Sequence, residues 1–150
     1  EVSKMLAINL FDNRTQKPTY GWGDKNELNK YLSINKNKSY PLVWQKLSGK
    51  SKTGNEVSQT CEFIFAVNFR KEELDLMNPD RLEATFKPVL YPFMESFLQA
   101  LNKSRNITIN VNEYDFSDIP NYPVTSLDDD VVDLWVAVSV SIDATFMNNC

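Results

Sequence analysis

The residue types that could perform chemistry in this sequence are few, because histidine is absent from all 150 residues. That absence excludes Ser-His-Asp and Cys-His catalytic sites and any metal site built on imidazole. The cysteines, Cys61 and Cys150, are too few for a zinc site made of four thiolates. Cys61 begins an apolar alternation, so we expect it to be a buried free thiol. The sequence therefore predicts no catalytic residue, no metal and no cofactor.

Two local patterns resemble ligand sites without meeting their requirements. Asp133 and the three acids at 128–130 could contact a hard cation, but an EF-hand loop needs alternating acids and a central glycine. Gly49-Lys50-Ser51 looks like the end of a phosphate-binding loop, yet Trp44 stands where its first glycine belongs. That segment also joins two expected strands, so no helix N-terminus follows it. Neither pattern predicts a metal or nucleotide site.

Charge is distributed unevenly along the chain, although the net charge is only −4. Residues 28–55 contain six lysines and no acid, whereas residues 111–150 contain eight acids and no Lys or Arg. The two segments are either solvated faces of one domain or complementary surfaces that meet between neighbouring copies. The second interpretation makes these residues candidates for contacts between subunits: Lys46, Lys50, Lys52, Asp128, Asp129, Asp130 and Asp133.

Residues 48–55 are rich in turn-forming types and carry Lys50 and Lys52. They have little apolar content to bury, so we expect an exposed hairpin tip that projects and contacts another subunit or partner. The arginines are scattered and few aromatics interleave the lysines. The sequence therefore gives little support for sequence-specific nucleic-acid binding.

Four segments carry strand patterns: residues 40–47, 60–70, 106–112 and 131–145. In the second, Cys61, Phe63, Phe65 and Val67 alternate with residues of the opposite face. We expect the first two strands to form a long antiparallel hairpin.

Helical periodicity predicts a short helix at residues 2–11 and a second short helix after Asp24. Asp24 would be the N-cap of the second helix and would pair with Glu27 in a capping box. A longer helix is expected over residues 78–102. Pro88 and Pro92 interrupt it, and each removes a backbone donor, so we expect a kink or a restart at Pro88.

The order of these elements predicts an α+β fold in a single domain over residues 1–150. It would hold a mostly antiparallel four-stranded sheet of two hairpins, with the proline-kinked helix and the short N-terminal helices packed on one face. Residues 15–23 and 114–130 are expected to be loops. No apolar run is long enough to span a membrane, and no signal-peptide pattern opens the sequence.

A resemblance to known proteins rests on four segments: residues 40–44 (YPLVW), 62–67 (EFIFAV), 86–93 (FKPVLYPF) and 97–101 (FLQAL). They resemble small proteins of tailed phages and prophages of Bacteroidetes-type hosts. Residues 20–29 are similar to a Tyr-Gly-His…Glu-x-x-Asn stretch of those proteins, and depart from it at Trp22-Gly23. The order of elements is also similar to the tail terminator fold and its head-tail joining, or neck, relatives.

This resemblance covers roughly residues 18–145 and implies a structural virion protein, not an enzyme. It implies a homo-oligomeric ring, most simply a hexamer, that caps the tail tube and docks it to the head connector. DNA would pass through the lumen without sequence-specific contact, and the subunit would assemble in the host cytoplasm and reside in the virion. The alternative is a small soluble α+β ligand-binding module, with its ligand between the kinked helix and the sheet.

Overall fold

Strands form most of the part of the chain that the structure, a computed structural model, describes: residues 8–9, 15–35, 40–68, 78–125 and 131–147. The strands are β1 (Ile8–Asn9), β2 (Thr15–Gln16), β3 (Thr19–Gly23), β4 (Leu42–Lys46), β5 (Ser51–Thr53), β6 (Glu56–Asn68), β7 (Ile107–Ile109), β8 (Asp115–Thr125) and β9 (Val131–Met147). The helices are α1 (Lys25–Asn35), α2 (Asn78–Arg81), the π-helical segment η4 (Leu82–Leu90) and α3 (Tyr91–Asn102).

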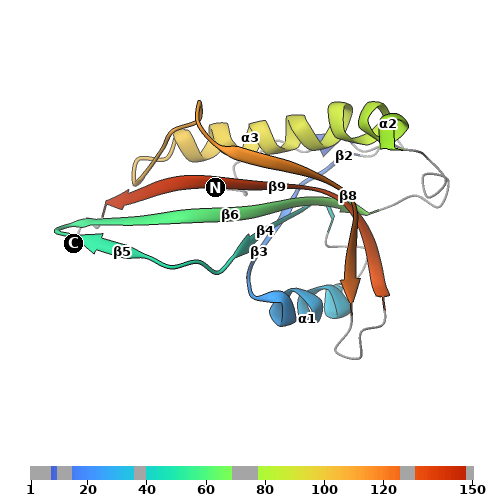
Figure 1. Cartoon of the computed structure of the whole chain (residues 1–150), viewed down its shortest axis with the longest axis horizontal. Coiled ribbons are helices and arrows are strands. Elements are labelled where there is room, and N and C mark those ends of the chain that lie inside the picture. Colours follow the sequence, from blue (N-terminus) through green and yellow to red (C-terminus); the bar gives the residue numbers. More distant parts are fainter. Residues whose placement is uncertain (1–7, 10–14, 36–39, 69–77, 126–130, 148–150) are drawn as a thin grey trace.

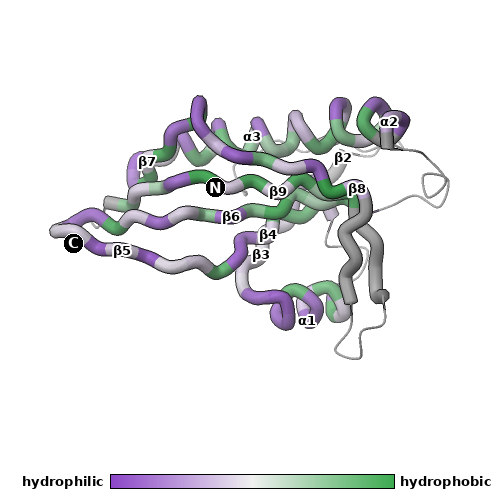
Figure 2. The backbone as a smooth tube through the Cα atoms, viewed as in Figure 1, coloured by the Kyte–Doolittle hydropathy of each residue, from purple (hydrophilic) through white to green (hydrophobic). Residues whose placement is uncertain are grey.

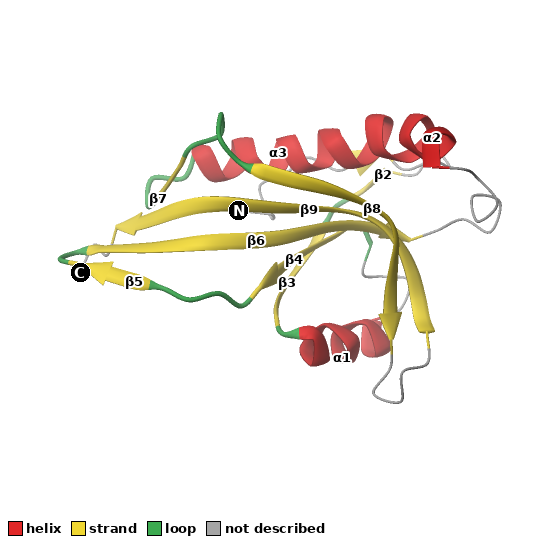
Figure 3. Ribbon diagram, in the orientation of Figure 1, coloured by secondary structure: helices red, strands yellow, loops and turns green. Residues whose placement is uncertain are grey.

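The architecture is α+β, with a mixed seven-stranded sheet that has α3 over one face and α1 under the other (Figure 1). The main strand order is β3-β4-β6-β9-β7. The outer edge of β6 carries both β4 and β5, and the outer edge of β9 carries both β7 and β8. Strands β5 and β8 therefore lie on opposite edges, with β6 and β9 between them (Figure 3).

The centre of the sheet is the antiparallel pair of β6 and β9, in register from Glu56 opposite Met147 to Asn68 opposite Trp135. The predicted alternation is confirmed, because Phe63, Phe65 and Val138 share one buried face. The predicted hairpin is confirmed too, since β4 and β5 both pair antiparallel with β6.

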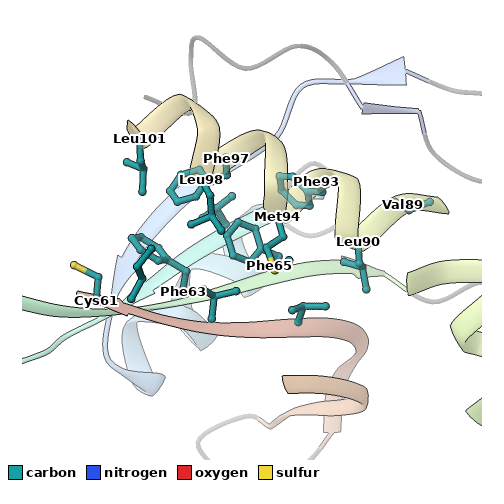
Figure 4. Packing of buried hydrophobic residues seen from close by; sticks show 14 of the residues in the cluster. Cys61, Phe63, Phe65, Val89, Leu90, Phe93, Met94, Phe97, Leu98 and Leu101 are labelled. Atoms are coloured by element: carbon teal, nitrogen blue, oxygen red, sulfur yellow. The ribbon is translucent and has the colours of Figure 1, made fainter. Parts of the chain in front are cut away.

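Helix α3 lays its apolar side on this face of the sheet (Figure 4). The ring of Phe65 meets that of Phe93 edge to face, with centroids 5.4 Å apart, and the rings of Phe63 and Phe97 are 5.0 Å apart. Edge-to-face pairs at this spacing add a specific geometry to the burial of apolar area. The core that was expected between helix and sheet is therefore present.

The opposite face of the sheet holds a second, smaller core under α1, which contains Leu28, Leu32, Trp44, Ile64 and Ala137. The prediction that all helices pack on one face is therefore wrong. Sequence patterning missed this arrangement because β4 and the far half of β6 are apolar on both sides, as expected for strands covered on both faces.

The start of α1 follows the predicted capping box. Glu27 N donates to Asp24 Oδ1 at 2.9 Å, and Asp24 N donates to Glu27 Oε2 at 2.8 Å. Gly23 precedes this turn with a φ of +142°, a region that L side chains rarely adopt. A Cβ on Gly21 would lie 2.3 Å from the indole of Trp44, so this glycine lets the ring lie against β3.

The predicted four-stranded, two-hairpin sheet is wrong in detail, because segments expected to be loops are strands. Strand β3 pairs parallel with β4, and β8 pairs antiparallel with β9. Pro120 and Pro123 favoured a loop for the second segment, but β8 is an edge strand with a register shift between Ile119 and Tyr122. Proline is tolerated in edge strands and beside bulges, where a missing donor costs little.

The N-terminal helix expected at residues 2–11 is wrong at residues 8–9, which form β1 and pair with β2. The remaining residues of that predicted helix lie outside the described part of the chain.

The long helix predicted over residues 78–102 is confirmed in outline, and its prolines fall where their missing donors are tolerated. Pro88 lies in η4, whose wider turns replace the regular bonding pattern. Pro92 is the second residue of α3, in its first turn, a place where proline is common. The α-helix thus restarts at Tyr91, three residues after the expected position.

Replacing Phe65 by alanine should lower the free energy of unfolding by about 3–5 kcal/mol, since its ring is fully buried among Phe63, Phe93 and Phe97. Denaturant unfolding measures this loss. Leu47→Ala is the control, because Leu47 is 60% exposed, and it should change stability by less than about 0.5 kcal/mol. Equal losses in the two variants would contradict the layering.

Candidate functional site

The clearest surface feature is a β-hairpin that extends beyond the end of α3 (Figure 1). We call residues 48–58 the lysine arm; it contains β5, the Gly54-Asn55 turn and the first part of β6. Gly54 has a φ of +60°, which suits the two-residue turn between Thr53 and Glu56. The arm is coloured hydrophilic to neutral over most of its length (Figure 2).

Lys50 and Lys52 are both exposed on the lysine arm, as the sequence indicated. Lys46 is not on the arm: it ends β4, and its Nζ lies 2.8 Å from Glu62 Oε2 of the same chain. Both side chains are nearly half exposed, so this ion pair adds little stability. It does give the Lys46 ammonium an acidic partner within its own chain.

The acidic candidates are placed less fully. Asp128, Asp129 and Asp130 lie outside the described residues, and Asp133 is described only as a β9 residue whose backbone faces Val124 of β8. The structure does not test contacts for these four residues, and their pairing with lysines stays a prediction.

Other acids, not singled out in the sequence, form a described group on and beside β8. We call Glu113, Asp115 and Asp118, all exposed, the acidic edge. Sequence analysis counted these acids but placed Asp115 and Asp118 in a loop, so the position of the acidic edge on the sheet edge opposite β5 was missed. The sequence signal that could have pointed to the acidic edge is the high acid content of residues 111–150.

A contact with the helical layer fixes the acidic edge. Tyr91 at the start of α3 donates its hydroxyl to Asp118 Oδ2 at 2.7 Å, and its ring meets Phe116 edge to face at 6.0 Å. Burial, followed by the hydrogen bond to Asp118, raises the pKa of Tyr91 to about 12. Tyr91 therefore stays a donor at neutral pH and anchors β8 to α3.

A hollow of 560 Å³ opens between the C-terminal half of α3 and the sheet. Its apolar walls include Phe63, Phe97, Leu101, Ile109 and Ile142. We call it the apolar pocket; Figure 4 shows Leu101 on the helix and Cys61 on the strand at this end of α3. Its volume is in the range of small-molecule sites.

Polar groups gather on one side of the apolar pocket. The hydroxyl of Tyr20 donates to Gln45 Oε1, and Gln59 Nε2 donates to Ser48 Oγ at 2.6 Å. Lys50 also lines this polar side of the pocket. Lys50 and Asp143 both line a second, shallow recess beside the lysine arm. The pocket therefore has an apolar floor and one polar, cationic rim.

Cys61 lies in this pocket as a buried free thiol, as predicted. Burial raises the pKa of the Cys61 thiol, with Lys50 lowering it and Asp143 raising it to smaller extents. A thiol with a raised pKa is mostly protonated at neutral pH, so it is a weak nucleophile.

Within the described residues, no three Cys, Asp or Glu side chains gather closely enough to hold a metal ion. None of the described helices combines the length and the hydrophobicity needed to cross a lipid bilayer. Comparisons with models of known protein families and with curated proteins found no match.

The raised Cys61 pKa predicts slow alkylation by iodoacetamide near pH 7, with a rate that rises with pH and is still rising past the ordinary thiol pKa of 9.0. In a Cys150→Ser background, Asp143→Asn should shift this profile to lower pH and Lys50→Gln to higher pH. Lys52→Gln is the matched control and should leave it in place. A profile centred below pH 9 would contradict the burial argument.

Proposed function

We propose that this chain is a structural, non-enzymatic subunit of a tailed-phage virion, a protein like the tail terminators that forms a homo-oligomeric ring. The observation that carries the proposal is the placement of opposite charges on opposite edges of one sheet. Lys50 and Lys52 lie at the β5 edge, and the acidic edge lies along β8. Such an arrangement favours head-to-tail contacts, which close into a ring when the rotation between copies permits.

The resemblance to tail terminator and neck proteins supports the same function. The segments that carry it supply α3, with Phe93 and Phe97, and the strand β6 on which α3 packs. In this proposal a ring, most simply a hexamer, joins the tail tube to the head connector. DNA passes through its lumen without sequence-specific contact. The subunit assembles in the host cytoplasm and resides in the virion.

The charges would set register and encounter rate more than affinity. Individual exposed pairs contribute about 0–1 kcal/mol, but a ring repeats each pair at every interface. Screening by salt weakens them as the Debye length falls below about 8 Å near physiological ionic strength. Assembly should therefore depend on ionic strength.

Native mass spectrometry and sedimentation across ionic strengths test this proposal. The wild-type chain should form a particle of several 17.3 kDa subunits that loosens as salt rises. Lys50→Glu/Lys52→Glu should dissociate it, because both charges on the lysine arm are reversed. Lys25→Glu/Lys30→Glu changes the net charge equally on exposed positions of α1 and should not. A wild-type monomer at all concentrations would contradict the proposal.

A second candidate function is a small ligand-binding module, and the apolar pocket is the observation that favours it. The hollow lies between α3 and the sheet and has a few polar groups at its rim, as small-molecule sites often do. A monomeric chain that binds an apolar fluorescent probe, with loss of binding on Leu101→Trp, would support this function over the ring.

A further inference from the structure

Phe116 is not among the residues that line the apolar pocket of its own chain. Its ring packs on Tyr91, the first residue of α3, whereas Leu101, near the end of α3, walls the pocket. Along the sheet the two features are neighbours, because Phe116 pairs with Val140 of β9 and Ile142, two residues further, lines the pocket. Phe116 therefore stands beside the pocket without filling it.

Phe116 has the properties of an inserted anchor. It is 50% exposed although it is a large apolar side chain, and it stands on the outer strand β8. Ring contacts with Tyr91 and Tyr114, at 6.0 Å and 6.1 Å, hold it in one orientation. An aromatic side chain that is ordered before binding loses little conformational entropy in the complex.

The surroundings of Phe116 and of the pocket are complementary in charge. Asp118 lies on the same side of β8 as Phe116, two residues along, while the pocket carries Lys50 at its rim. The Asp118 carboxylate accepts one hydrogen bond from Tyr91 and has further acceptor sites for a cation. An aromatic anchor flanked by an acid thus matches an apolar socket flanked by a lysine.

We propose that Phe116 of one copy inserts into the apolar pocket of the next copy, with Asp118 facing Lys50 at the rim. The anchor and the socket are different surfaces, so the contact is head-to-tail, and an open assembly has one free anchor at one end and one free socket at the other. This inference deepens the proposed function and rests on it, because it names the contact through which copies of the chain would form the ring.

The first experiment separates anchor and socket into different chains. Phe116→Ala removes the anchor, and Leu101→Trp fills the socket from the end of α3, where Leu101 is 8% exposed. Each variant alone should be monomeric, with self-association weakened roughly thirtyfold or more, as for the loss of a central aromatic anchor. Mixed in equal amounts, the two should form a heterodimer, because the Phe116→Ala chain keeps a socket and the Leu101→Trp chain keeps an anchor.

A charge exchange tests the same contact with Phe116 and the apolar walls of the pocket unchanged; Asp118→Lys also removes the acceptor of the Tyr91 hydroxyl. Lys50→Glu and Asp118→Lys should each weaken association, and the double variant should regain it, because every interface then has the pair reversed. Lys52→Glu combined with Asp118→Lys is the matched control and should not regain it. Thermal unfolding of each variant verifies that the chains are folded.

The outcomes distinguish this contact from the ring itself. Wild-type-sized particles from both Phe116→Ala and Leu101→Trp would overturn the anchor and leave the ring proposal standing on another interface. Monomeric variants whose mixture stays monomeric would also overturn it. A wild-type chain that is monomeric and binds an apolar probe in the pocket would overturn both proposals.

Discussion

The antiparallel pairing of β6 with β9 is the constraint on which the rest of the structure depends. Its register, from Glu56 opposite Met147 to Asn68 opposite Trp135, fixes which side chains face α3 and which face α1. A shift of one residue would exchange the two faces of one strand. Because these strands are much longer than α3, the helix covers only part of them. The lysine arm lies beyond the end of α3, where helical cover stops (Figure 1). The apolar pocket is lined by Leu101, next to the last residue of α3.

The parts of β6 and β9 that α3 leaves uncovered belong to the surfaces through which copies of the chain would associate in the proposed ring. The central pair separates β5 from β8, so the charges of the lysine arm and of the acidic edge cannot neutralise each other by strand pairing within one sheet. Lys50 and Asp143 do share a recess, so the separation concerns the edges and not every charge. In the proposed contact, burial of an aromatic ring supplies most of the affinity, and the charges select the register.

The sequence allowed the central elements to be predicted, because their signals are local. Alternation identified β6 and β9, the Asp24 and Glu27 pair identified the start of α1, and apolar periodicity identified α3. Edge strand β8 was hidden by its prolines, whose cost depends on which edge of the strand faces solvent. The acidic edge, Phe116 and the apolar pocket depend on tertiary placement. No local pattern indicates that the half-exposed ring of Phe116 stands beside a hollow that it does not fill.

The most direct test of the central claim is to crosslink lysines to carboxylates in an equal mixture of unlabelled and heavy-isotope-labelled wild-type chains. A carbodiimide joins only groups already in contact, and the isotopes tell contacts between chains from contacts within one. The account predicts crosslinked peptides of mixed isotope content that join Lys50 or Lys52 to Glu113, Asp115 or Asp118. Crosslinks of these lysines that are found only within single chains would contradict it.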